Sequence, residues 1–242
     1  MNIANKTILV TGTNRGIGRA LINEALKRGV KQVYAGARGD LQHTDPRVTP
    51  LKLDVTDTAQ IQHVATRVNA LDLLINNAGI VQYVDLSVPG VLDQHLAVNL
   101  FGMLQVTQAF TPALLRNNGA IANILSLAAI APIPLAPAYS LSKAAASNLT
   151  QSLRALLAGQ GVKVHAVFPG PIDTDMSRGL DIPKASTEST AIAIFDGIER
   201  GDEDIFPDPV SQSIADSWRA GVAKGLEAQF AVFVPDSAKK PA

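Results

Sequence analysis

The sequence predicts an α/β fold: a doubly wound, Rossmann-type parallel sheet of about seven strands with helices on both faces. Short apolar, β-branched runs alternate with segments of helical period, as in repeated βαβ units. The strand runs are apolar throughout rather than at alternate positions, which is typical of a sheet covered on both faces. A glycine-rich turn directly follows the first strand, where such sheets bind nucleotides.

Composition narrows the possibilities further. The chain has 242 residues, of which 47% are hydrophobic, and this suits one domain over residues 1–242. Basic and acidic residues number 21 each, so we expect neither a nucleic acid nor a membrane as partner. The absence of cysteine excludes disulfides and thiol chemistry. The first residues lack the pattern of an export signal, so we expect a cytoplasmic protein.

In the first half of the chain, apolar runs predict strands at residues 7–11, 32–37, 48–55 and 71–75. A helical pattern follows the glycine turn and ends at Gly29, and a second one covers residues 58–68. The link from the second strand to the third, residues 38–47, is too short for a full helix.

In the second half, strands are expected at 120–125, 162–168 and 204–206, and helices at 92–115, 138–157 and 187–199. Residues 120–139 are apolar enough to suggest a membrane span. However, Pro132, Pro134 and Pro137 would break a helix there, so we predict a buried strand followed by a loop.

The pattern of apolar residues in the C-terminal segment predicts a helix over about residues 211–230. Its apolar residues recur every four positions, namely Ile214, Trp218, Val222, Leu226 and Phe230. We expect this stripe to pack against the body of the protein, and residues 236–242 to form a frayed tail.

The glycine turn contains Gly12, Gly16 and Gly18 between a strand and a helix. Glycines at these positions allow the backbone to approach a phosphate, and the helix N-terminus then faces the anion. Arg15 lies in the turn and Arg38 ends the second strand, where an acid would instead bind a ribose hydroxyl. Two guanidinium groups favour a 2′-phosphate, so we expect NADP(H) rather than NAD(H).

A second group of polar residues lies in a stretch without charge between Arg116 and Lys143. Ser126 ends the fifth strand, and Tyr139 and Lys143 are four residues apart on a helix, so they share a face. Burying unpaired polar groups costs free energy, so their presence in an apolar stretch indicates a reaction centre. A phenol titrates near 10, so a nearby ammonium group is needed to stabilise its phenolate. We therefore predict a site of proton transfer.

The order of these motifs resembles the short-chain dehydrogenase/reductase family over the first three quarters of the chain. The motifs are Thr11-Gly12-x-x-x-Gly16-Ile17-Gly18, Asp54-Val55, Asn76-Asn77-Ala78-Gly79, Asn99, Ser126, Tyr139-x-x-x-Lys143 and Pro169-Gly170-Pro171-Ile172-x-Thr174. The resemblance implies a Rossmann-type domain and NAD(P)(H)-dependent carbonyl/alcohol chemistry like that of carbonyl reductases. The chain departs from the family in its short 38–47 link and in lacking a glycine-rich C-terminal ending.

The resemblance also implies residue roles. The catalytic residues would be Ser126, Tyr139, Lys143 and Asn99, with Tyr139 as acid/base and Asn99 placing a water. Asn99 is equally compatible with a local backbone contact, and Asp54 with a turn or N-cap. The cofactor contacts would be Gly12, Arg15, Gly16, Ile17, Gly18, Arg38, Asp54, Val55, Asn76, Ala78, Gly79, Tyr139, Lys143, Pro169, Gly170, Ile172 and Thr174.

The expected substrate pocket has apolar and aromatic walls, formed by Val81, Tyr83, Ala128, Ile130, Pro134, Leu135 and Met176. Such walls favour a neutral, hydrophobic ketone or aldehyde, although each residue could instead belong to the core. Residues 177–186 are expected to form a lid. Alternatives are a 3-oxoacyl-thioester reductase and a non-catalytic NADP(H)-binding sensor.

Two further expectations concern metals and self-association. The four histidines show no metal-ligand pattern; His63 and His95 are expected on helix surfaces, and no metal is expected. Residues 96–115 and 144–153 carry no charge, although a helix that covers only a sheet should have a charged outer stripe. We therefore expect a homodimer or homotetramer through the helices at 92–115 and 138–157.

Overall fold

The computed structural model describes residues 1–235 and contains a seven-stranded parallel sheet of order β3-β2-β1-β4-β5-β6-β7. The strands are β1 (Thr7–Thr11), β2 (Gln32–Ala37), β3 (Val48–Lys52), β4 (Leu73–Asn76), β5 (Ala120–Ile124), β6 (Lys163–Val167) and β7 (Asp204–Ile205). The strand order reverses between β1 and β4, and ligands of open α/β sheets bind at such a point. The predicted fold class is confirmed. The expected tail at 236–242 lies outside the described residues.

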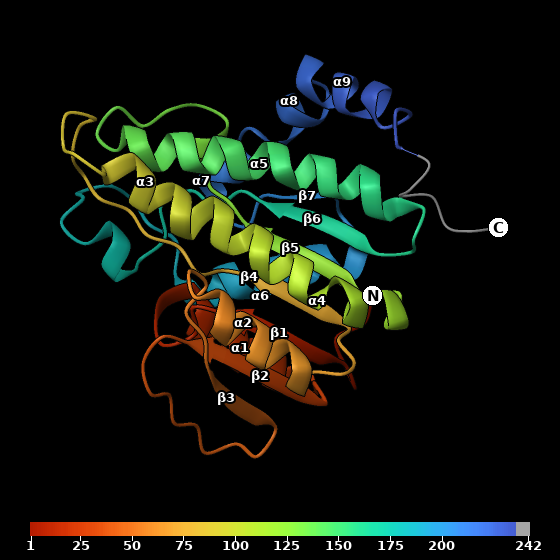
Figure 1. Cartoon of the computed structure of the whole chain (residues 1–242). Helices are drawn as coiled ribbons and strands as arrows, with labels where there is room; N and C mark the ends of the chain where they lie inside the picture. The colour runs from red at the N-terminus through yellow and green to blue at the C-terminus, as the bar shows by residue number, and fades with distance from the viewer. Residues whose placement is uncertain (236–242) are drawn as a thin grey trace.

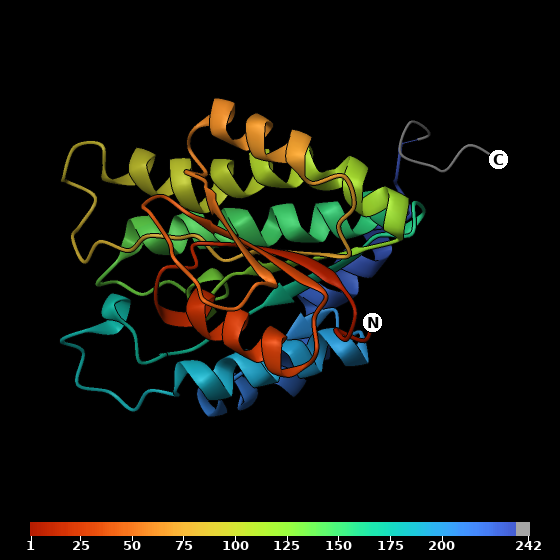
Figure 2. The ribbon, with the colours of Figure 1, turned by 90° about the horizontal axis from the view of Figure 1, so that it is seen from below.

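Helices cover both faces of the sheet (Figures 1 and 2). On one face are α1 (Gly16–Lys27) and α6 (Thr187–Arg200), and on the other are α2 (Thr58–Arg67), α4 (Met103–Asn117) and α5 (Pro137–Ala158). Successive β1 residues alternate between the two cores: Val10 packs toward α1 and α6, whereas Leu9 packs toward α2 and α4. This two-sided burial explains why the strands are apolar throughout.

Two ambiguous segments fold as the sequence predicts. The link at 38–47 contains no helix. Residues 120–139 form β5, the short 3₁₀ turn η2 (Leu127–Ala129), a loop and the first turn of α5. Among the described residues, no helix combines the length and the apolar character needed to cross a membrane.

The predicted helix at 92–115 is a composite. It begins with α3 (Val91–Leu96), continues through the π-helical segment η1 (Ala97–Gly102) and ends with α4. Asn99 lies in η1 and is almost completely buried. Because π-helical turns often occur at functional sites, this irregularity supports Asn99 as a candidate functional residue.

The C-terminal segment differs from the prediction. Residues 209–230 form three short helices, α7 (Pro209–Gln212), α8 (Ala215–Arg219) and α9 (Val222–Phe230), and the extended backbone at Gly221 separates α9 from α8. Trp218 packs on Phe168, with ring centroids 5.3 Å apart. However, Val222 is 81% and Phe230 62% exposed, so the expected packing of the whole stripe is wrong.

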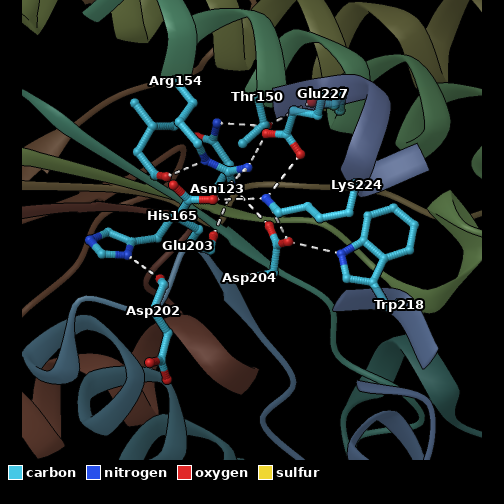
Figure 3. A network of polar contacts seen from close by, with 12 residues as sticks. Asn123, Thr150, Arg154, His165, Asp202, Glu203, Asp204, Trp218, Lys224 and Glu227 are labelled. Carbon is cyan, nitrogen blue, oxygen red and sulfur yellow. Dashed lines mark hydrogen bonds and ion pairs between the residues drawn. The ribbon is translucent and has the colours of Figure 1, made fainter. Parts of the chain in front are cut away.

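Polar contacts hold α9 in place instead (Figure 3). Lys224 and Glu227 lie on its inward face, and Glu227 pairs with Arg154 of α5. Lys224 lies 3.0 Å from Asp204 of β7, whose carboxylate also accepts the Trp218 indole N–H at 2.8 Å. The charged side of α9 therefore faces the protein and its apolar side faces outward.

Candidate active site

A cavity of about 560 Å³ lies where the carboxyl ends of the strands meet the following loops. Arg15 and Arg38 line it beside the ends of β1 and β2, and Ser126, Tyr139 and Lys143 line it beside the end of β5, two strands beyond β1 in the sheet. Of the residues predicted from sequence, those lining it are Gly12, Arg15, Gly16, Ile17, Gly18, Arg38, Asp54, Val55, Ala78, Gly79, Val81, Tyr83, Ser126, Tyr139, Lys143, Pro169, Gly170, Ile172, Thr174 and Met176. Neighbouring strand ends thus bring together motifs that are far apart in the sequence.

The glycine turn is closely packed at the start of α1. A side chain at Gly18 would collide with the Gly12 carbonyl oxygen. The turn is held from the next strand by Asn77, whose amide donates to the carbonyls of Thr11 (2.9 Å) and Gly12 (3.0 Å). The N-terminal turn of α1 therefore opens into the cavity with backbone N–H groups available for an anion.

Asn76 does not line the cavity, although it was expected at the cofactor. Its buried side chain donates to Thr107 Oγ1 (3.0 Å) and Asn123 Oδ1 (2.9 Å), on the side of the sheet covered by α4. The next residue, Asn77, lines the cavity instead. Because Asn76 ends β4 as a regular strand residue, alternation along the strand points the two side chains in different directions.

The two predicted arginines lie at the same end of the cavity. The Arg15 guanidinium is 2.7 Å from the Asp175 carboxylate, across from the glycine turn. The hydrogen bond from Arg15 lowers the pKa of Asp175 below its ordinary value, with help from Arg178. Arg38 is exposed at the end of β2. Both guanidiniums are therefore within the part of the cavity that faces the glycine turn.

The other end contains the predicted reaction centre. Ser126 follows β5, and its hydroxyl accepts a hydrogen bond from the Ala128 N–H at 3.1 Å. The first turns of α5 carry Tyr139 and Lys143, and the Ser126 hydroxyl is close enough to the Tyr139 phenol to influence its pKa. Lys143 Nζ lies 5.8 Å from the Tyr139 ring centroid and donates to the Ile124 carbonyl at 2.7 Å.

Burial controls the protonation of this pair. Removal from water raises the pKa of the Tyr139 phenol to about 12, although the nearby Ser126 hydroxyl opposes the rise. Removal from water also lowers the pKa of the Lys143 ammonium to about 8. At neutral pH, Tyr139 is therefore protonated, and it lies beside a cation that loses its charge only slightly above physiological pH.

Asn99 lies behind this pair and does not line the cavity. Its Oδ1 accepts the Ile80 N–H, and its Nδ2 donates to the Ile80 carbonyl. Nδ2 also donates to Ser142 Oγ at 2.9 Å. A Cβ atom at Gly79 would lie 3.2 Å from Asn99 Oδ1 and 3.7 Å from Lys143 Nζ, so both atoms border the same narrow space. Asn99 thus joins the loop after β4 to α5, which corresponds to the local-contact alternative for this residue.

His95 is fully buried, so its expected place on a helix surface is wrong. The loop after β4 folds back over α3, and the Gln82 N–H donates to His95 Nε2 at 3.1 Å. The other nitrogen lies 2.7 Å from the Val91 carbonyl, and the ring contacts Tyr139 edge-on with centroids 6.5 Å apart. His95 therefore supports the loop that carries two wall residues, Val81 and Tyr83.

The predicted substrate walls are partly displaced. Val81, Tyr83 and Met176 line the cavity, and the Tyr83 hydroxyl donates to the Met176 carbonyl at 3.0 Å. Ala128, Ile130, Pro134 and Leu135 do not line it. The Ala136 N–H bonds the Ile133 carbonyl at 2.9 Å, so Pro134 and Leu135 occupy the centre of a turn and are exposed.

Sequence reasoning missed several further lining residues: Asn14, Leu53, Thr56, Asn77, Ile80, Val98, Ile124, Leu125, Leu127, Ile133, Ala136, Pro171, Asp175, Ser177, Leu180, Ile182 and Val210. Ser177, Leu180 and Ile182 belong to the predicted lid, and the apolar character of Leu180 and Ile182 in a polar loop was the available signal. Asp54 lines the cavity, but its carboxylate also accepts the Thr56 N–H at 2.9 Å, so the turn role holds as well.

A family model described as short chain dehydrogenase matches residues 6–184. The chain belongs to the short-chain dehydrogenase family. A crystal structure of a short chain dehydrogenase from Burkholderia cenocepacia in complex with NADP is 37% identical, with a TM-score of 0.87 over 97% of this chain and 100% of that one.

Two curated relatives of this short-chain dehydrogenase differ in extent. The short chain dehydrogenase TazN of Aspergillus terreus is 36% identical over 74% of this chain, but the match spans only 44% of TazN. The 1-deoxy-11-beta-hydroxypentalenate dehydrogenase of Streptomyces avermitilis is 34% identical over 80% of this chain and 78% of its own length.

Proposed function

We propose that this short-chain dehydrogenase uses NADPH to reduce a neutral, hydrophobic ketone or aldehyde to an alcohol, in a reversible reaction. The observation that carries the proposal is the meeting of Ser126, Tyr139 and Lys143 at the dry end of the cavity. A buried phenol and a buried ammonium with strongly shifted pKa values are typical of acid–base catalysis.

The cavity fits the proposed cofactor. The glycine turn lines the cavity at the N-terminus of α1, where backbone N–H groups could bind a pyrophosphate. Arg15 and Arg38 could then bind a 2′-phosphate, with Arg15 exchanging its contact to Asp175. The NADP complex of the Burkholderia relative supports this choice of cofactor.

The cofactor choice can be tested with Arg38→Asp. We expect the KM for NADPH to rise by about tenfold or more and the preference to move toward NADH, because a charge-assisted contact is replaced by repulsion. Lys31→Asp, which changes an exposed cation outside the cavity, is the control. Unchanged NADPH constants in Arg38→Asp would contradict the assignment.

The chain's own residues suffice for the proton chemistry. NADPH, when bound, supplies the hydride. Ser126 can donate a hydrogen bond to the carbonyl oxygen of the substrate, and Tyr139 can protonate that oxygen. Lys143, fixed by the Ile124 carbonyl, then stabilises the resulting phenolate through its positive charge. Asn99 belongs to this proposal as the residue that joins the Ile80 backbone to α5.

The substrate class follows from the walls. Val81, Tyr83, Met176, Leu180 and Ile182 are apolar or aromatic and suit an uncharged substrate. The alternative thioester reductase would need cations for an acidic carrier, yet Arg178 pairs with Asp175. The sensor alternative predicts loss of the Tyr139–Lys143 pair, which the chain retains.

One assay separates these readings: NADPH consumption over a panel of aryl and alkyl ketones and a 3-oxoacyl thioester. We expect ketone turnover, and a loss of about 10³-fold in Tyr139→Phe because the proton donor is removed. Tyr34→Phe, a β2 tyrosine outside the cavity, is the matched control. Full activity in Tyr139→Phe would refute the mechanism, whereas NADPH binding without any turnover would favour the sensor.

Self-association through α4 and α5 is also part of the proposal. Phe101 of η1 and Leu141 of α5 are exposed, and so are Val222 and Phe230 of α9, the helix that lies next to α5 in Figure 1. Exposed apolar residues on neighbouring helices suit a contact between subunits. Sedimentation that detects only monomer at micromolar concentration would contradict a dimer or tetramer.

A further inference from the structure

Asp208 lies three residues after the end of β7, outside all the motifs described above, and is only 2% exposed. Its carboxylate accepts four hydrogen bonds. Oδ2 receives the Gly170 N–H and the Ser211 hydroxyl, each at 2.7 Å. Oδ1 receives the N–H groups of Val210 (3.1 Å) and Ser211 (3.0 Å). Both oxygens face N–H donors, so the site requires a group that accepts on both sides.

The contact with Gly170 fixes one peptide group at the cavity. The carbonyl of Pro169 accepts the Leu127 N–H at 3.0 Å, while the N–H of Gly170 donates to Asp208. The peptide between Pro169 and Gly170 is therefore held at both ends, once from the residue after Ser126 and once from Asp208. Pro169, Gly170 and Leu127 all line the cavity.

The fit at this point leaves no spare room. A Cβ atom at Gly170 would lie 2.7 Å from Asp208 Oδ1 and 3.3 Å from Val210 Cβ. Asp208 is the N-cap of α7 and accepts the N–H of Val210, a residue that lines the same cavity. One buried carboxylate thus sets the relative position of the 169–170 peptide and an apolar wall residue.

We propose that Asp208 is a positioning residue for the nicotinamide half of NADP(H), and not for its adenosine half. This inference rests on the proposed function. Hydride transfer requires the nicotinamide at the Tyr139 and Ser126 end, where the 169–170 peptide lies, whereas Arg15 and Arg38 mark the opposite end. Asp208 acts through the backbone of Gly170, without lining the cavity itself.

The test is Asp208→Asn, which preserves shape but replaces one acceptor oxygen by an NH₂ donor. In either amide orientation, that NH₂ group faces an N–H group of Gly170, or those of Val210 and Ser211. Kd values are measured calorimetrically for NADPH and for adenosine 2′,5′-bisphosphate, which lacks the nicotinamide half. We expect the Kd for NADPH to rise about tenfold. The Kd for the bisphosphate should change less than about twofold.

The control is Asp216→Asn on α8, where the carboxylate is fully exposed and neither Kd should change. Gly170→Ala tests the same contact from the other side and should give the same selective loss, even if Asp208→Asn fails to fold. Equal losses for both ligands, or no loss for either, would overturn the inference alone. Failure of the wild-type protein to bind either ligand would overturn the cofactor proposal and this inference together.

Discussion

Two cations on α5 with little exposed surface, the buried Lys143 and the mostly buried Arg154, have opposite surroundings. Lys143 Nζ donates to the Ile124 carbonyl, and no carboxylate lies within ion-pair distance of it in residues 1–235. Arg154 pairs with Asp204 at 2.8 Å and with Glu227, and also donates to the carbonyls of Val164 and Glu203. A buried charge without a partner is costly, so its retention indicates chemistry, whereas a fully paired one indicates structure.

The pKa values express the same contrast. Burial lowers the pKa of Lys143 to about 8, since nothing nearby compensates its charge. Around Arg154, burial alone would raise the pKa of Asp204, but Arg154, Trp218 and Lys224 outweigh it and lower that pKa. The ionised Asp204 then connects β7 to α5, α8 and α9 (Figure 3).

The largest effect is expected from Lys143→Met. The kcat for ketone reduction should fall about 10³-fold, because the phenolate of Tyr139 loses its cation. The free energy of unfolding should stay unchanged or rise, since the substitution removes an uncompensated buried charge. Steady-state kinetics and urea denaturation measure both quantities, with the exposed Lys52→Met as control. A clear loss of stability would show that Lys143 is needed for the fold.

Arg154→Met should have the opposite effects: a loss of stability with little change in kcat. Asp204 and Glu227 would lose their main partner, so the free energy of unfolding should fall by about 3 kcal/mol. The kcat of the folded protein should change little, because Arg154 lies outside the cavity. Guanidinium denaturation monitored by the fluorescence of Trp218 provides the measurement.

Arg200→Met is the matched control for this substitution. Arg200 pairs with Asp202 on the surface, where an ion pair contributes at most about 1 kcal/mol. Equal losses in the two variants would mean that the network beneath α9 contributes no more than a surface pair.

These two regions also show what a sequence can predict. Tyr139 and Lys143 could be paired because helical spacing alone puts them on one face, and Ser126 because parallel strands end at a common edge. The stripe of Val222, Leu226 and Phe230 was recognised, but periodicity does not say which side of a helix faces the protein.

The side of α9 that faces inward depends on partners far along the chain. Arg154 attracts Glu227 and Asp204 attracts Lys224, and no local sequence pattern reveals either attraction. His95 was misplaced for the same reason, since the N–H group that covers it comes from Gln82 in a loop. Regular spacing could be read from the sequence, whereas contacts made by loops and by distant charges required the structure.

The smallest effect expected is a pH dependence of the rate of ketone reduction, caused by the titration of Lys143. With a pKa of about 8, Lys143 loses its charge above that pH, while Tyr139 remains protonated up to about 12. The rate of ketone reduction should therefore fall about tenfold per pH unit above 8. A rate independent of pH from 7 to 9.5 would contradict a role for the ammonium charge.

Stability should change in the opposite direction over the same range. The pKa of Lys143 in the folded protein lies below its ordinary value of 10.5, so between pH 8 and 10.5 the unfolded chain binds more protons. The free energy of unfolding contributed by this residue therefore rises with pH in that window. The difference between wild type and Lys143→Met, measured by urea denaturation at pH 8 and pH 10, isolates this contribution. If that difference is the same at both pH values, the charge of Lys143 is compensated in the fold, and the contrast with Arg154 fails.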